Sequence, residues 1–298
     1  MSLLTRAEAA LKLHFDAAAG AGAPQRLQAA MQHAVFSGGA RIRPQLCMAV
    51  ALACGDDVPE LTDAAATAIE LMHCASLVHD DMPCFDDADM RRGQVTVHKQ
   101  FGEPLALLTG DALIVAAYQT LVRAGAAHPQ RLVGLLELLG EGVGAPSGIV
   151  AGQAWECETR ADLGQYQRAK TGALFVAATC AGAESAGADP LPWRALGDCL
   201  GEAYQVADDI RDVLADQAMM GKPQGQDITH DRPSSARDLG LVGAVQHFDE
   251  LVYKAINSIP SCKGEKMLRG LVAKEAERLI PESWFANTNR PLHHHATV

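Results

Sequence analysis

Positive charge is in short supply in this sequence. Its 298 residues carry 25 Lys and Arg against 36 Asp and Glu, a formal net charge of −11. A general nucleic-acid binder needs a basic face, so this balance argues against nucleic acid as a partner. It does not exclude a phosphorylated substrate, because a divalent cation can bridge one acid to another. Gly and Pro are also too few for a disordered or fibrous chain.

The sequence also lacks the spacing patterns that mark disulfide frameworks and common nucleotide sites. Eight cysteines are present, but none form a Cys-x-x-Cys pair, and they are scattered through Ala-rich, helix-like sequence. This usage is typical of reduced core cysteines in a cytoplasmic protein. A P-loop and a GxGxxG fingerprint are both absent, and so is the strand that each requires.

Long uninterrupted apolar runs are missing as well. The first sixteen residues include two acids and have no long apolar core, so they predict a first helix rather than a signal peptide. Residues 105–122 approach the length that spans a bilayer, but Gly110 and Asp111 in their middle favour a buried helix. We therefore expect no stable membrane insertion.

What the sequence does have is helical periodicity. Apolar residues recur at spacings of three and four, and alternation with a period of two is rare. Helices are expected at roughly 3–19, 24–37, 41–54, 60–82, 104–126, 128–142, 146–157, 161–170, 171–186, 191–218, 235–257 and 263–279. No Gly- and Pro-rich break is long enough to link two domains. The sequence thus predicts an all-α fold and one domain over 1–298, with a loose tail after about 281.

Two of the expected helices are apolar nearly all round, at 104–122 and 171–181. In a protein outside the membrane, such helices are expected to be central and wrapped by others.

Two acidic clusters each follow an apolar helix. Residues 80–93 contain five Asp and end in Arg91 and Arg92. The second cluster contains Asp208 and Asp212, which are four residues apart and so share one helix face. Either cluster could be a solvated helix end, or a cation could normally bind there.

The bound cation is the better interpretation of these clusters. Acids at a helix C-terminus oppose the helix dipole, and like charges beside an apolar flank repel strongly. Two such clusters, each followed by basic residues, suggest carboxylates that face each other across a cavity and hold a hard divalent cation such as Mg²⁺. Nearby basic residues would then fit as phosphate ligands: Arg41, Arg43, Arg91, Arg92, Lys170 and Lys222.

Glu70 and His73 offer a rival metal site, because they form a Glu-x-x-His pair of the kind found in di-iron bundles. Such sites need a second pair, and the sequence has none.

Taken together, the motifs resemble the polyprenyl (isoprenyl) diphosphate synthase family over about residues 30–280. The segments that carry the resemblance follow the family's order: GGARIRP (38–44), the first aspartate-rich motif in its longer form (69–93), GQ (152–153), KTGALF (170–175), QVADD (205–209) and GKPQGQD (221–227). Within the family, the chain is most similar to bacterial geranylgeranyl diphosphate synthases of carotenoid or photosynthetic-pigment pathways.

The resemblance implies an isoprenoid-synthase-type helical bundle around a central cavity, usually as a homodimer, and it implies a role for each matching residue. Three Mg²⁺ would be held by Asp80, Asp86 and Asp208. The allylic diphosphate would be bound by Arg91, Lys170 and Lys222, and the reaction centre lined by Thr171 and Gln205. Isopentenyl diphosphate would be bound by Arg43, His73 and Arg92.

Two positions depart from the family pattern. Ala40 and Arg232 stand where the family usually has Lys. The first change removes one expected ligand of isopentenyl diphosphate, whereas the second keeps the charge.

Product length in this family depends on side chains just before the first aspartate motif, here Ala75 and Ser76. A small residue at 75 leaves room for a longer tail, so geranylgeranyl diphosphate is the expected product. The alternatives are a farnesyl diphosphate synthase, a class I terpene cyclase and a non-catalytic subunit of another synthase.

Overall fold

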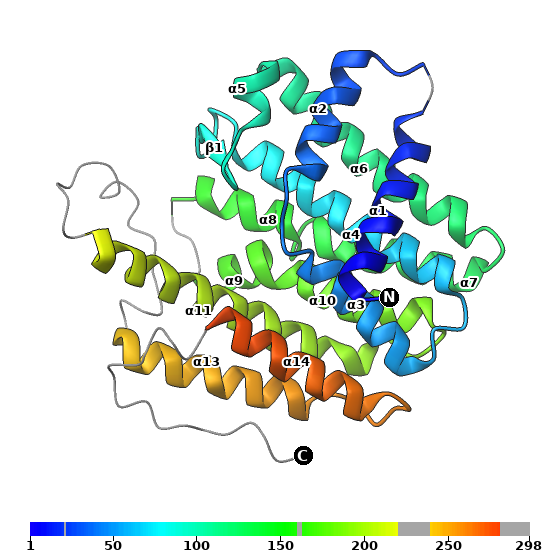
Figure 1. The fold of residues 1–298 in the computed structure, drawn as a ribbon, viewed down its shortest axis with the longest axis vertical. Coiled ribbons are helices and arrows are strands. Elements are labelled where there is room, and N and C mark those ends of the chain that lie inside the picture. Colours follow the sequence, from blue (N-terminus) through cyan, green and yellow to red (C-terminus); the bar gives the residue numbers. More distant parts are fainter. Residues whose placement is uncertain (21, 160–162, 220–238, 281–298) are drawn as a thin grey trace.

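Helices make up nearly all the regular structure of the computed structural model, which describes residues 1–20, 22–159, 163–219 and 239–280 (Figure 1). The expected all-α class is confirmed. Within the described residues, the strands are confined to one short antiparallel hairpin, β1 (Met90–Arg91) and β2 (Gln94–Val95). The expected tail after 281, and Arg232, lie outside the described residues.

The first part of the chain forms α1 (Leu3–Ala19), α2 (Gln25–Phe36), α3 (Ile42–Cys54), α4 (Pro59–Asp80), α5 (Val97–Phe101), α6 (Glu103–Gly125) and α7 (Pro129–Val143). The second part forms α8 (Ile149–Ala154), α9 (Leu163–Gln167), α10 (Ala173–Ser185), α11 (Arg194–Met219), α13 (Gly240–Asn257) and α14 (Glu265–Leu279). Short 3₁₀ turns lie at Trp155–Cys157 and Leu191–Trp193.

Local sequence explains where several helices begin and end. The hydroxyl of Ser2 accepts a hydrogen bond from the Thr5 backbone N–H at 3.1 Å and caps α1. Proline opens α4, α6 and α7 within their first two residues, where its missing N–H is harmless. Gly55 ends α3 at φ 124°, a conformation that glycine adopts without strain.

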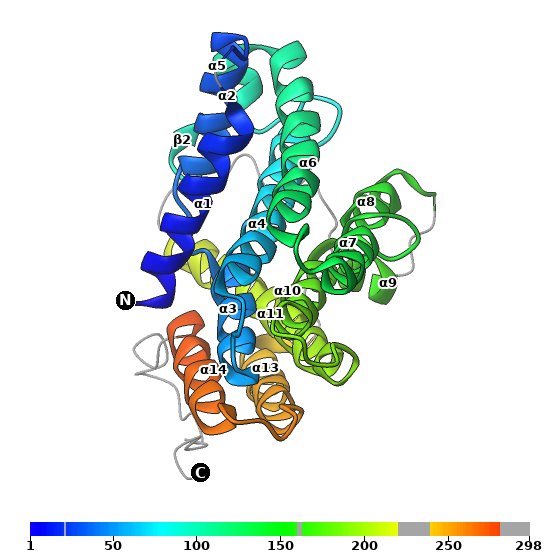
Figure 2. The same ribbon diagram turned by 90° about the vertical axis from the view of Figure 1, so that its right-hand side faces the viewer.

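Helices α4 and α10 form the centre of the molecule. Helix α4 packs against α1, α3, α6 and α10, while α10 packs against α3, α7 and α11 (Figures 1 and 2). Most residues of α10 are buried, and most of these are small (Ala, Gly, Ser, Thr or Cys), so its neighbours approach it closely. A continuous apolar core runs from α1 to α14 through these two helices.

The expectation that the apolar helix at 104–122 would be wrapped on all sides is wrong. Leu108, Val115 and Val122 of α6 are 50%, 54% and 49% exposed. Within the described residues, α6 is the one helix whose length and composition would allow it to cross a membrane, and 44% of its most apolar window is buried. Its inner face packs on α4, whereas no element among the described residues covers its outer face (Figure 2).

The region between α7 and α10 also differs from the sequence prediction. Helix α8 begins three residues later than expected, and a π-helix at Arg168–Gly172 joins α9 to α10. The hairpin and α5 were not expected, because elements of two to five residues are too short to show a periodic pattern.

Candidate active site

A cavity of about 800 Å³ opens between α3, α4, α8, α10 and α11. One end, which we call the charged end, carries Asp80, Arg91, Lys170 and Asp208. The other, the apolar end, is lined by small and aliphatic side chains: Ala75, Ile114, Val143, Ile149 and Leu174. The cavity therefore combines an ionic region with a region suited to a hydrocarbon.

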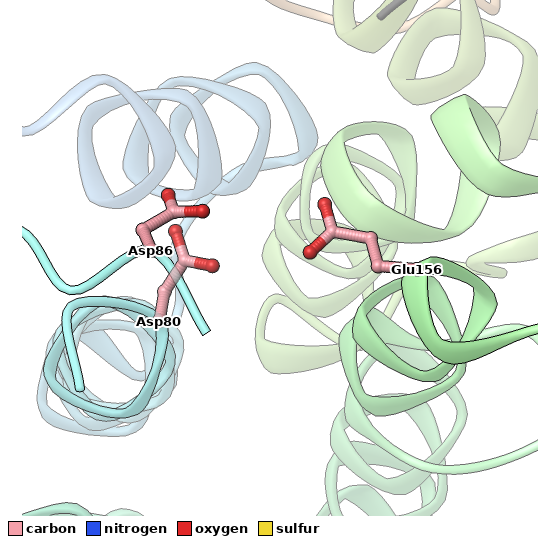
Figure 3. A group of neighbouring side chains, drawn as sticks. All are labelled: Asp80, Asp86 and Glu156. Carbon is pink, nitrogen blue, oxygen red and sulfur yellow. The ribbon is translucent and has the colours of Figure 1, made fainter. Parts of the chain in front are cut away.

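Three carboxylates converge at the charged end (Figure 3). Asp80 ends α4, Asp86 lies in the loop after it, and Glu156 reaches across from the 3₁₀ turn after α8. Each offers one oxygen, and these oxygens all lie within 4.8 Å of one another. Oxygen donors at this spacing suit Mg²⁺, which prefers carboxylates together with phosphate oxygens.

Two basic side chains offset this negative charge. The ammonium of Lys170 lies 2.5 Å from Glu156 and 3.4 Å from Asp80. Arg91 lies 3.7 Å from Asp80, but its guanidinium donates to Asp81 from Nε at 2.9 Å and from Nη2 at 2.5 Å. Arg91 is thus fixed mainly by Asp81, and the Nη2 that donates to Asp81 is also its atom nearest Asp80.

Burial raises the pKa of Asp80, because the charged form is poorly solvated beside the apolar core. Lys170 and Arg91 oppose this shift, whereas Asp86 and Glu156 add to it. A positive charge added at the charged end would therefore stabilise the ionised carboxylates there.

Glu156 is also held in place by its own neighbours. The hydroxyl of Tyr166 donates to it at 2.6 Å, and the amide of Gln153 donates at 3.0 Å. The carboxylate is therefore oriented toward the two aspartates from the opposite wall.

The second acidic cluster contributes to the same cavity. Asp208 of α11 lines it and forms an ion pair with Arg211 at 2.7 Å. Behind it, Thr171 donates to Gln205 at 3.0 Å, and Gln205 donates to Asp209 at 3.1 Å.

Not every predicted member of this cluster can be placed. Lys222 lies outside the described residues, and so does the side chain of Asp212.

A group of cations lies beside the carboxylates. The guanidinium of Arg92 approaches Nε2 of His73 at 3.3 Å and donates to the Gly38 carbonyl at 2.6 Å. Arg43 stacks over the ring of Phe175 at 4.7 Å, and its buried Nε has no hydrogen-bond partner in the part of the chain that the structure describes. Burial, and then the nearby arginines, hold the pKa of His73 well below its usual range. This group is arranged to receive an anion.

Arg41 was predicted to bind phosphate, and this prediction is wrong. Its side chain is buried, pairs with Glu70 at 2.7 Å and Glu8 at 2.9 Å, and donates to the Val35 carbonyl. Because Glu70 is committed to this buried ion pair, the rival di-iron interpretation of Glu70 and His73 also has no support.

Two glycines allow backbone and side chains to approach closely at the site. A Cβ at Gly152 would lie 2.4 Å from the backbone nitrogen of Lys170, so only glycine lets α8 pack on the π-helix. A Cβ at Gly39 would lie 2.5 Å from Nη1 of Arg92, and its φ of 131° also favours glycine.

Ala75 lies on the cavity wall, 1% exposed, one to two helical turns before Asp80. Ser76 also lines the cavity and donates to the His73 carbonyl at 2.8 Å. Because a helix rises about 1.5 Å per residue, Ala75 lies roughly 7–8 Å from Asp80 along α4. Chemically, the cavity can hold a metal-bound diphosphate with an apolar tail beside it.

Comparison with known proteins decides the family. The family model of Polyprenyl synthetase matches residues 24–271. The chain belongs to the polyprenyl synthetase family. Members of this family generally depend on Mg²⁺, which agrees with the donor set of the three carboxylates.

Two bacterial members resemble the chain over nearly its whole length. Geranylgeranyl diphosphate synthase of Cereibacter sphaeroides is 53% identical over 281 residues, covering 94% of this chain and 98% of that protein. Geranylgeranyl diphosphate synthase of Rhodobacter capsulatus is 50% identical over 280 residues, covering 94% and 97%.

A solved structure of the family has the same fold. The geranyltransferase of Helicobacter pylori, complexed with magnesium and isoprenyl diphosphate, superposes with a TM-score of 0.74. It is 27% identical, and the match covers 93% of this chain and 98% of that one.

Sequence reasoning missed Glu156 as a member of the charged end. A weak signal was present, because Glu156 follows Gln153 of the GQ motif by three residues and so shares a helix face with it. A single acid without neighbouring aspartates gave no reason to single it out.

Proposed function

We propose that the protein is an Mg²⁺-dependent prenyltransferase that condenses isopentenyl diphosphate with an allylic diphosphate and releases geranylgeranyl diphosphate. The observation that carries this proposal is the cavity, in which carboxylates and basic side chains at one end adjoin an apolar wall at the other. The relative that is 53% identical over almost the whole chain is named after this activity.

Asp80, Asp86 and Asp208 would hold the metal, with Glu156 as a further carboxylate on the facing wall. When bound, Mg²⁺ would supply the positive charge that makes diphosphate a competent leaving group. We propose three ions, the number that the resemblance to the family implies. Lys170 and Arg91, together with Lys222, would bind the same diphosphate directly.

The second diphosphate would bind beside the first. Arg43 and Arg92 offer bidentate guanidinium forks, and neutral His73 offers a hydrogen bond between them. A diphosphate bound there would neutralise the arginines that surround His73. The double bond of isopentenyl diphosphate would then face the allylic carbon, and Thr171 and Gln205 would line the space between the two substrates.

The apolar wall would protect the reacting centre and set product length. Aliphatic side chains exclude water from the allylic cation, which water would otherwise quench. Ala75 and Ser76 would leave space for a tail that grows past α4. A larger side chain at 75 would stop growth at farnesyl diphosphate, which remains the second candidate product.

The assembly would be a homodimer formed through α6. Its exposed Leu108, Val115 and Val122 repeat every seven residues and form an apolar stripe. A groove of about 400 Å³ lies along the stripe, lined by Val115, Tyr118 and Val122. An apolar surface of this kind is typical of subunit contacts. Sedimentation of the wild type and of Val115→Glu would test this, since a charge in the stripe should favour the monomer.

The protein would act in the cytoplasm. It would fold as a single domain, because one apolar core joins α1, near the start of the chain, to α14. The sequence resemblance favours service in a carotenoid or photosynthetic-pigment pathway. Co-expression with downstream carotenoid enzymes should then yield pigment.

The proposed activity is tested by incubating the protein with radiolabelled isopentenyl diphosphate, Mg²⁺ and each allylic primer in turn, and sizing the dephosphorylated products. Geranylgeraniol as the main product supports the proposal, and a chelator should abolish it. Farnesol as the end product would favour the second candidate, and cyclised products would favour a terpene cyclase. No product with any primer would favour a non-catalytic subunit.

A further inference from the structure

Two cysteine thiols stand apart from the other six. All eight cysteines lie within the described residues and are free, but Cys84 and Cys157 are the two that are exposed. Burial raises the pKa of Cys74 to about 12 and of Cys54 to about 11, which keeps these thiols protonated and unreactive. Cys84 and Cys157 are therefore the two thiols most open to a reagent in solution.

Both exposed thiols line the proposed catalytic cavity. Cys84 lies in the loop between Asp80 and Asp86, and Cys157 directly follows Glu156. The carboxylates of these two segments converge from opposite walls of the cavity (Figure 3), and Cys84 and Cys157 line the cavity from the same two segments.

We infer that Cys84 and Cys157 form a thiol-modification site at the charged end of the cavity, which takes small uncharged disulfides. This inference rests on the proposed function insofar as modification is expected to stop turnover. While no Mg²⁺ is bound, the three carboxylates outnumber the adjacent Lys170, so anionic reagents are disfavoured because like charges repel on approach. Neutral disulfides are therefore the favoured class.

The chemistry is thiol–disulfide exchange. A cysteine sulfur gives up its proton and attacks one sulfur of the small disulfide, the reagent's S–S bond breaks, and a mixed disulfide forms on the protein. The cysteine is oxidised, the released half of the reagent is reduced, and that half takes up the proton. A reducing thiol reverses the step.

An adduct at either position would obstruct the charged end. It would occupy cavity space beside the three carboxylates and beside Lys170, where the allylic diphosphate is proposed to bind. Bound diphosphate should in turn shield both sulfurs. Adduct and substrate should therefore exclude each other. A thiol elsewhere on the surface would not compete with substrate in this way.

The test uses 4,4′-dithiodipyridine, a neutral disulfide whose released thiopyridone is measured by absorbance. The native protein should release two equivalents rapidly and lose turnover, and dithiothreitol should restore both thiols and activity. Mg²⁺ with an unreactive allylic thiolodiphosphate should slow the rapid release about tenfold when saturating. The anionic reagent 5,5′-dithiobis(2-nitrobenzoate) should react more slowly than the neutral one.

Three variants locate the effect. Cys84→Ser and Cys157→Ser should each remove one rapid equivalent, and the double variant should keep turnover in the presence of the reagent. Cys262→Ser, at a half-buried thiol between α13 and α14, is the matched control and should behave like the wild type. Equal inactivation of the double variant, or full turnover with both thiols modified, would overturn the inference.

Failure of the proposed function gives a different result. Untreated protein would then show no turnover, while the rapid thiol count and its dependence on Cys84 and Cys157 would still report on the site. A rapid release that the Cys84→Ser and Cys157→Ser variants leave unchanged would overturn the inference even in that case.

Discussion

At the charged end of the cavity the side chains are held by ion pairs, whereas at the apolar end they are held by packing. Asp80, Glu156 and Lys170 lie within a few ångströms of one another and come from separate elements. Ala75 and Leu174, by contrast, belong to the continuous core and are 1% exposed.

Substitutions at the two ends of the cavity should therefore have different consequences. Removing a charge at the charged end leaves the core intact and should change the rate of reaction. Changing a volume at the apolar end alters packing and should change product length or stability. The predictions below test this separation.

The largest effect is expected from loss of a single carboxylate at the charged end. Asp80→Asn, Asp86→Asn and Asp208→Asn should each lower kcat about 100- to 1,000-fold, the size typical of removing one electrostatic contact to the transition state. Melting temperatures should stay close to the wild type, because burial already raises the pKa of Asp80 and a neutral side chain suits it. Near-wild-type kcat at saturating Mg²⁺ would remove that residue from the metal site.

Asp111→Asn is the matched control for these variants. Asp111 is exposed on α6 and does not itself line the cavity, and its loss should change neither kcat nor the melting temperature.

At the apolar end, Ala75→Tyr should shift the main product to farnesyl diphosphate. Overpacking typically costs about 1–3 kcal/mol, and roughly 1.4 kcal/mol against the last addition already gives a tenfold discrimination. Product sizing and a melting curve on the same sample measure both effects. A lower melting temperature with an unchanged product would instead assign Ala75 to packing alone.

A control on the same helix sharpens this prediction. Ala68 is buried on α4 but does not line the cavity. Ala68→Tyr should lower the melting temperature and leave product length unchanged.

The cations near His73 should make stability depend on pH. Because the pKa of His73 is depressed in the folded protein, the unfolded chain binds a proton below about pH 6.5 that the folded one does not. The contribution of His73 to stability is thus present above that pH and lost as the pH falls, by at most about 1.4 kcal/mol per pH unit. Urea unfolding of wild type and His73→Gln at pH 7.0 and 5.5 should show a smaller loss in the variant.

Two further measurements bear on the same point. Inorganic diphosphate should reduce the pH effect in the wild type, because it neutralises the neighbouring arginines. Leu174→Ala should destabilise the protein by about 2–5 kcal/mol at both pH values, since no titration is involved. Equal pH dependence in wild type and His73→Gln would show that His73 titrates normally.

The smallest effect is expected from Ala40→Lys. Ala40 is exposed and does not line the cavity, so an added ammonium there would be largely solvated. The KM for isopentenyl diphosphate should fall only a few-fold, in line with less than about 1 kcal/mol for an exposed charge contact. An unchanged or higher KM would mean that Arg43 and Arg92 already supply the charge needed.

The sequence allowed most of the fold to be predicted, because long helices repeat their apolar positions often enough to be recognised. The apolar stripe of α6 could not be foreseen. Hydropathy reports how apolar α6 and α10 are, but not how many neighbours cover each one.

The charged end was only partly predictable. The aspartates cluster in the sequence and attract attention, whereas Glu156 is a single acid whose partners come from other elements. Arg41 and Arg43 lie in the same motif, yet Arg41 precedes α3 in a left-handed conformation at φ 50°, whereas Arg43 lies on the helix, so their side chains point in different directions. One therefore pairs with buried Glu70 and the other faces the cavity, which composition alone cannot distinguish.

The π-helix at Arg168–Gly172 constrains how this segment can change during evolution. It adds one residue to the turn that carries Lys170 and Thr171, both of which line the cavity. Deleting one residue would restore a regular α-helix and rotate the preceding side chains by about 100° relative to α10. Homologous sequences should thus keep the length of the segment between Tyr166 and Ala173, and an alignment gap there would mark a protein that has lost this active site.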